Sequence, residues 1–355
     1  MDEIFSLLKE NPVNNRLVIM PVTRLLIHQP FSIDRFHFFP PGELDLRALR
    51  PVPNKTLENE IARGNNQLDE QTLREICSSA TGFDVEVLES NVLIVFLYQM
   101  NWHDFLSVHD HNDDIELIKL LSSKAEKALD IIRFNFCRLD LSDTLPGLAG
   151  SFLGSEEYLG AMLYTPEHHE SYLIAGAAVE CSIVIKGLGL EIDSPPTTQM
   201  PTPELGEVSL IASHGLSLLT DAMTASNETT KFIRLMTLLE FLASPDEYQI
   251  WKKLKGQIAC HSANTKAEYL NISKRLKYFS SLVENGIQRG LRTLIVHHGK
   301  FLADIHPSQD DRKALFLEIQ DYVSCVLQDM INNSTLTWQE YISRREFLKE
   351  KLGVS

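Results

Sequence analysis

The sequence contains few cysteines, and they form no recognisable pattern. The five cysteines are widely spaced, and no two have the CxxC spacing typical of zinc-binding or redox sites. Their odd number also argues against a disulfide framework. We therefore expect no structural metal site and a reducing compartment.

Long apolar runs are also absent. The longest, VLIVFLY at 92–98, is far shorter than the roughly 20 residues that a membrane-spanning helix needs. The first residues, MDEIFSLLKENP, are acidic, and their apolar part is too short for a signal peptide. The sequence thus predicts a cytoplasmic protein with no membrane partner.

Positive charge is scarce over most of the chain. There are 33 basic and 48 acidic residues, a net charge of −15, which excludes a protein that coats nucleic acid through charge alone. However, residues 231–304 hold twelve Lys and Arg against six Asp and Glu. We expect any anionic ligand to bind in this stretch, although solvated helices often carry surplus lysine as well.

Proline is concentrated in one segment. SPPTTQMPTPE at 194–204 has four prolines in eleven residues, a density that disfavours helix and central strand alike. A chain of 355 residues is longer than one core usually supports. We therefore expect a proline-rich linker at 194–204 between two domains.

The two sides of this linker differ in their apolar patterns. Residues 1–193 combine a helical pattern at 115–136 with strand-like stretches at 91–100, 156–165 and 171–193, so an α+β domain is expected. After the linker, helical patterns occur at 205–225, 230–243, 245–259, 266–283, 286–298 and 310–331. They predict an all-α bundle over 205–333, followed by a C-terminal helix within 334–355.

The stretch GLRTLIVHHGKF at 290–301 adds polar groups to an apolar helix. On a helical wheel for 286–298, the apolar side chains facing the core are Ile287, Leu291, Leu294 and Ile295. His298 falls on the same face, which favours a packed histidine, and His297 lies on its flank. Arg292 lies on the far side beside Val296, which indicates that a second subunit covers that side.

Arg292 and His297 have a structural and a catalytic interpretation. A histidine before a terminal glycine is favoured by the helix dipole, and arginine commonly forms ion pairs. Histidine also titrates near neutral pH, and arginine binds phosphate oxygens, so together they suit metal-free cleavage of RNA. The two residues lie about 140° apart on a straight helix, so a partner helix would have to complete such a site.

Arg292, four intervening residues and His297 resemble the motif of HEPN domains, an all-helical family of ribonucleases and nucleotide-binding modules. LRTLIVHHGKF is similar to the motif helix of the ApeA-like branch, and KFIRLMTLLEFLA at 231–243 is similar to an earlier helix of that branch. The resemblance covers 205–333. It implies a homodimer with a composite, cofactor-free site that cuts RNA, such as tRNA, and not DNA. It also implies a role in bacterial anti-phage defence or toxin-like growth arrest, with the N-terminal domain sensing a trigger, such as a phage product, or holding the substrate.

The resemblance also assigns roles. His297 would be the general acid/base and Arg292 the phosphate clamp; supporting residues would be Thr293, His298 and Glu240, and RNA contacts would come from Lys300 and Arg289. Catalytic members usually carry Asn, Asp or His where this chain has Thr293. The alternative is therefore a non-catalytic HEPN-fold module that dimerises and binds a nucleotide or a partner. We expect Glu240 to pair with Arg292 or orient His297, with a structural contact to Arg234 or to a helix N-terminus as the alternative.

WHDFLSVHDHNDD at 102–114 gathers three histidines with several aspartates. It lacks regular metal-ligand spacing and has the composition of a loop that leads into a helix. A metal hydrolase built on it is a third hypothesis, and it predicts inhibition by a chelator.

Overall fold

The structure is a computed structural model that describes residues 15–49, 82–107, 111–141, 144–152, 155–166, 170–177, 189–202, 204–225, 227–247 and 249–354. The chain divides into two compact units. The first comprises Met1–Leu129 and Asp143–Thr197, and the second Asp130–Ser142 and Thr198–Ser355. The boundary at Thr197 lies inside the proline-rich segment, whose described residues form neither helix nor strand. Residues 334–355, where a separate C-terminal helix was expected, belong to the second unit, as do residues 130–142.

The first unit is built on a seven-stranded antiparallel sheet, in the order β3-β4-β5-β1-β7-β6 with β8 paired to β7. The strands are β1 (Asn15–Val22), β3 (Phe31–Ile33), β4 (Phe36–Phe39), β5 (Val92–Gln99), β6 (Ser151–Phe152), β7 (Ser155–Thr165) and β8 (Glu170–Ala177). A separate parallel pair joins β2 (Leu25–Ile27) to β9 (Leu190–Ile192). The helices are α4 (Val85–Glu89), α5 (Trp102–Ser107) and α6 (His111–Phe136), whose residues from Asp130 on belong to the second unit, besides a 3₁₀ turn at Arg47–Leu49.

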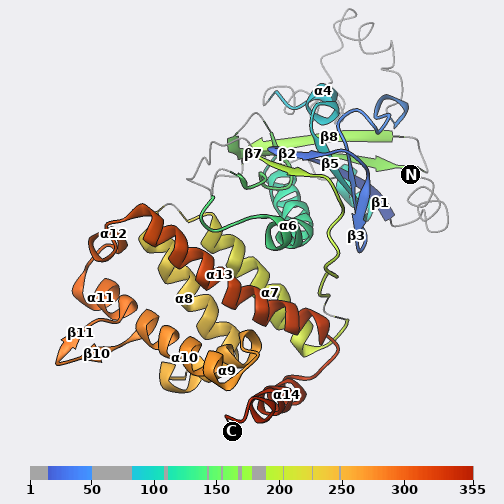
Figure 1. Ribbon diagram of the computed structural model, residues 1–355. Helices are drawn as coiled ribbons and strands as arrows, with labels where there is room; N and C mark the ends of the chain where they lie inside the picture. Colours follow the sequence, from blue (N-terminus) through green and yellow to red (C-terminus); the bar gives the residue numbers. More distant parts are fainter. Residues whose placement is uncertain are drawn as a thin grey trace, which may run out of the picture. The chain divides into compact units, whose positions relative to one another are not determined.

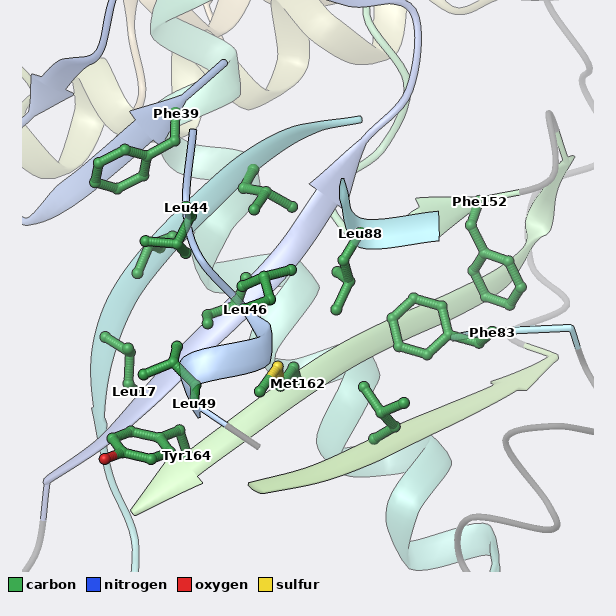
Figure 2. Packing of buried hydrophobic residues seen from close by; sticks show 14 of the residues in the cluster. Leu17, Phe39, Leu44, Leu46, Leu49, Phe83, Leu88, Phe152, Met162 and Tyr164 are labelled. Carbon is green, nitrogen blue, oxygen red and sulfur yellow. The ribbon is translucent and has the colours of Figure 1, made fainter. Parts of the chain in front are cut away.

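The core of this unit lies on both faces of the sheet, because the central strands are apolar on both sides. Figure 2 shows one face, where Leu17 and Met162 from the sheet pack with Leu46 and Leu88 from the segments that cover it. Helix α6 lies behind the sheet in that view. Its residue Leu121 is fully buried. The α+β expectation for this part of the chain is confirmed.

The second unit is helical. Its helices are α7 (Glu207–Met223), α8 (Glu228–Ala243), α9 (Trp251–Ser262), α10 (Lys266–Ser280), α11 (Leu291–His298), α12 (Leu302–Ile305), α13 (Gln309–Asn332) and α14 (Trp338–Lys351). Helices α7, α8 and α13 lie side by side (Figure 1). Side-chain caps at Asn227, Thr265, Ser308 and Thr337 fix where four of the helices begin. The helical expectation for this part is also confirmed.

The helix expected over 286–298 is wrong in its first part. A hairpin of β10 (Val283–Glu284) and β11 (Ile287–Gln288) precedes α11. Its two turn residues, Asn285 and Gly286, both have positive φ, at 51° and 76°, as an Asn-Gly hairpin turn requires. Helix α11 therefore starts only at Leu291, and Ile287 is exposed instead of facing the core.

Three further predictions need correction. His298 is exposed, not packed, because it is the last residue of α11, directly before the Gly299 that ends the helix. Helix α9 begins at Trp251 instead of 245, and residues 102–107 form the short helix α5 instead of a loop. Of the strand expected over 171–193, residues 178–188 lie outside the described part of the chain. None of the helices in the described part is both long and apolar enough to cross a membrane.

Candidate functional site

Arg292, in the first turn of α11, forms an ion pair with Glu240 of α8. Its Nη1 lies 3.2 Å from Oε1 of Glu240, and its Nη2 donates to Oε2 at 3.4 Å. The same carboxylate accepts a hydrogen bond from the indole N–H of Trp251. Of the partners expected for Glu240, the structure therefore has Arg292. Arg234, the structural alternative, donates instead to the backbone carbonyl of Asp221.

This ion pair is only partly buried. The Arg292 side chain keeps 34% of its surface exposed and the Glu240 side chain 20%. The guanidinium is therefore held in place by the Glu240 carboxylate, which the Trp251 indole also binds, yet solvent still reaches it. Such a group remains accessible to an anionic ligand.

The start of α11 is fixed against the end of α10. Both Arg289 and Gly290 donate their backbone N–H to the carbonyl of Leu282, at 2.6 and 3.2 Å. A Cβ at Gly290 would lie 2.5 Å from the backbone N of Leu282, so only glycine fits this close approach. Thr293 donates its hydroxyl to the carbonyl of Ser280 at 3.2 Å. Thr293 thus anchors the helix, a role that the sequence alone did not indicate.

The two histidines lie at the other end of α11. His297 and His298 are both exposed, and Gly299 ends the helix in the left-handed conformation with φ 65°. Within the described residues, no hydrogen bond or ion pair joins either histidine to Arg292. The structure therefore brings Arg292 and Glu240 together but leaves His297 on another side of the helix. Lys300 and Arg289, the expected RNA contacts, are exposed as well.

Exposed apolar side chains are frequent around this motif. The chain from 283 to 301 has four whose surface is more than half exposed: Val283 at 60%, Ile287 at 53%, Val296 at 51% and Phe301 at 66%. Val296 follows Arg292 by one helical turn and so shares its side of α11. Large apolar side chains gathered in one exposed region are typical of surfaces that contact another molecule.

A cavity of about 300 Å³ lies beside Glu240. Its lining includes the carboxylates of Glu240, Asp246 and Glu247. Carboxylates repel phosphate, so an RNA strand is not expected to enter this cavity. A phosphate would have to reach the exposed part of Arg292 from elsewhere.

The structure contains a buried polar cluster beneath α14 that the sequence did not predict. His261 of α9 accepts a hydrogen bond from Nε of Arg345 at 3.1 Å, and its Nδ1 lies 3.3 Å from Asp329, off the line of a good hydrogen bond. Asp329 also accepts the hydroxyl of Tyr341 at 2.9 Å and Nε of Arg344 at 3.1 Å. These residues are far apart in sequence and carry no motif, so nothing in the sequence brought them together.

This cluster is structural. Arg345 donates to the carbonyls of Leu242 and Ala243 at 2.7 and 2.9 Å. It thus provides hydrogen-bond donors for carbonyl groups at the C-terminal end of α8, which have no partner within the helix. Burial lowers the pKa of His261. Burial alone would raise the pKa of Asp329, but its hydrogen bonds hold that pKa well below its usual range. The cluster fastens α14 to the helical unit.

Metal-ligating residue types converge at one place within the described residues, where His28, Glu191 and Asp193 meet. All three are exposed, and the 2.8 Å contact between His28 and Glu191 is an ordinary surface hydrogen bond. Of the 102–114 segment, His103, Asp104 and Asp114 form no such group, while 108–110 lie outside the described residues.

Comparison with known proteins found no family model, no curated protein and no solved structure that matches this chain.

Proposed function

We propose that this chain is a metal-independent endoribonuclease of HEPN type that acts as a homodimer in the cytoplasm. The observation that carries the proposal is that Arg292 is both held by an ion pair and partly exposed to solvent. Glu240 fixes its guanidinium through two contacts, yet a third of the side chain stays exposed, eight residues before Lys300 and five before the exposed His297. In this proposal Arg292 is the phosphate clamp and His297 the general acid/base.

The chemistry follows from the two side chains. His297 removes the proton of a ribose 2′-hydroxyl, which then attacks the adjacent phosphorus and expels the 5′-oxygen of the next nucleotide. Arg292 stabilises the negative charge that grows on the phosphate oxygens, because Glu240 uses only part of its fork of donors. The expelled oxygen takes a proton from the imidazolium, so the histidine also acts as the acid.

The site needs two copies. Arg292 and His297 point about 140° apart on one α11, so they reach the same phosphate only when a second α11 supplies the missing group. The exposed Val296 shares the side of Arg292 and suits an apolar contact between the two helices. His298 would support the site, with Lys300 and Arg289 contacting the RNA backbone, while Thr293 holds α11 in place.

The biological role is proposed from the HEPN resemblance. A ribonuclease that cuts RNA such as tRNA arrests growth, which suits defence against phage. The first unit would respond to a trigger, for example a phage product.

The test is cleavage of cellular RNA by purified protein, together with growth arrest in a bacterial host. We expect Arg292→Ala and His297→Ala each to lower cleavage by about 100-fold or more, and a chelator to have no effect. Arg234→Ala is the matched control, since that arginine binds a backbone carbonyl on the neighbouring helix. Variants that cleave RNA as fast as the parent would overturn the proposal.

A second candidate is a non-catalytic HEPN-fold module that dimerises and binds a nucleotide or a partner. It is favoured by two contacts that fully explain their residues as structural, namely Arg292 with Glu240 and Thr293 with the carbonyl of Ser280. Glu240→Gln separates the two candidates. In the ribonuclease it reduces cleavage more than stability, whereas in the module the parent cleaves nothing and the substitution changes stability alone.

A further inference from the structure

A second cavity, of about 700 Å³, lies in the first unit where β5 extends beyond β4. Strand β4 pairs with β5 only at Leu93, Ile94 and Val95, whereas β5 continues to Gln99. This leaves one edge of β5 open beside the turn between β3 and β4. The volume is within the range of about 300–1,000 Å³ that small-molecule sites occupy.

The lining of this cavity includes two cations. Arg35 comes from the turn between β3 and β4, and Lys124 from α6. Within the described part of the chain, neither has a carboxylate within 4 Å. Each instead lies over a ring: Arg35 5.6 Å from the centroid of Phe36, and Lys124 5.5 Å from that of Tyr98. Among the described residues of the lining, Asp34 is the one carboxylate, so Arg35 and Lys124 give this part of the wall a net positive charge in an acidic chain.

The remaining lining includes aromatic side chains, which suit a planar ring. Phe36 and Phe96 are buried with ring centroids 5.1 Å apart, and the half-buried Tyr98 follows on the same strand as Phe96. Asn15 and Gln99 lie directly opposite each other in the β1–β5 register and also line the cavity. Gln99 follows Tyr98 in β5, so the side chains of Asn15 and Gln99 point to the face of the sheet opposite to that of Tyr98.

We propose that this cavity binds a nucleotide. Arg35 and Lys124 hold its phosphate groups, and Tyr98 contacts the base ring. This inference goes beyond the proposed ribonuclease and depends on none of its residues. It gives the first unit a ligand of defined chemistry.

The experiment is calorimetric titration of the full chain with ATP, AMP and pyrophosphate. We expect saturable binding of ATP and AMP, weakened about tenfold or more by Arg35→Gln and by Lys124→Gln. Lys127→Gln is the matched control, because Lys127 lies exposed on the same helix and does not line the cavity. It should bind as the parent does, and circular dichroism should show that all three variants are folded.

Three outcomes would overturn the proposal. They are no saturable binding of ATP or AMP, equal binding by the Lys124→Gln variant, and pyrophosphate binding as tight as that of ATP. The last outcome would leave an anion site without recognition of a ring. Arg292→Ala should still bind ATP, so a failed ribonuclease proposal would not be mistaken for a failed nucleotide site.

Discussion

The surroundings of an arginine decide what it can bind, as a comparison of Arg292 with Arg345 shows. Arg345 is buried, with two donors on the last carbonyls of α8 and its guanidinium 4.8 Å from the ring centroid of Tyr341. Its hydrogen-bonding capacity is used inside the protein. Arg292 has one carboxylate partner and a third of its surface in solvent. Only the second arginine is available to a ligand, which is why the proposed site centres on it.

Buried His261 makes stability depend on pH. Burial lowers its pKa from the ordinary 6.5, so His261 is neutral in the folded protein and binds a proton more readily once unfolded. The stability that neutral His261 contributes is fully present above about pH 6.5 and is lost as the pH falls below this value. We expect the free energy of unfolding in urea to decrease between pH 7.5 and pH 5.

The control for this prediction is His261→Gln, which removes the titrating group. Asp329 does not interfere in this range, because the stability that its lowered pKa contributes is lost only as the pH falls below its ordinary value of 3.8. The variant should be less stable than the parent at pH 7.5 but lose less stability on acidification. Parallel pH profiles for parent and variant would show that His261 is not responsible.

At the scale of elements, the position of α11 depends on the turn that precedes it. A Cβ at residue 290 would lie 2.5 Å from Cα of Ser281 and 2.7 Å from the carbonyl oxygen of Ser280, both backbone atoms that cannot rotate away. We expect Gly290→Ala to lower the free energy of unfolding by about 1–3 kcal/mol, measured by urea denaturation. RNA cleavage should fall as well, since α11 carries both proposed catalytic residues.

The matched control is Gly299→Asn at the other end of the same helix. Gly299 has a left-handed φ of 65° but nothing within 4 Å of an added Cβ, and asparagine tolerates that conformation. This substitution should cost less than Gly290→Ala. An equal loss in both variants would mean that glycine matters here for chain flexibility and not for the close approach.

Helices with a capping residue and several regularly spaced apolar residues could be predicted from the sequence, whereas strands of two residues could not. Helix α8 combines an Asn227 cap with five regularly spaced core residues, so propensity and packing agree. The β10–β11 hairpin has only two residues in each strand, too few for an alternating pattern to compete with the helical period of the sequence that follows. Its Asn-Gly turn was the signal that could have revealed it.

At the scale of the whole molecule, one contact of the candidate site was among the expectations from the sequence. Glu240 was expected either to pair with Arg292 or to orient His297, and the structure has the contact with Arg292. The cluster of His261, Asp329 and Arg345 could not be predicted, because these residues meet only after three helices pack. The cavity beside Lys124 likewise depends on where a strand pairing ends, which no local pattern reports.

A site shared between two copies of the chain predicts that two inactive variants complement each other. A dimer of one Arg292→Ala copy and one His297→Ala copy still holds one intact Arg292 and one intact His297, on different subunits. We expect cleavage to return when the two variants are co-expressed with different tags and the mixed dimer is purified through both. The control dimer pairs Arg292→Ala with the double variant, which lacks His297 as well as Arg292. If the doubly tagged dimer forms but cleaves no faster than this control, an arginine and a histidine from different subunits do not act on the same phosphate, and the site must be assembled within one chain.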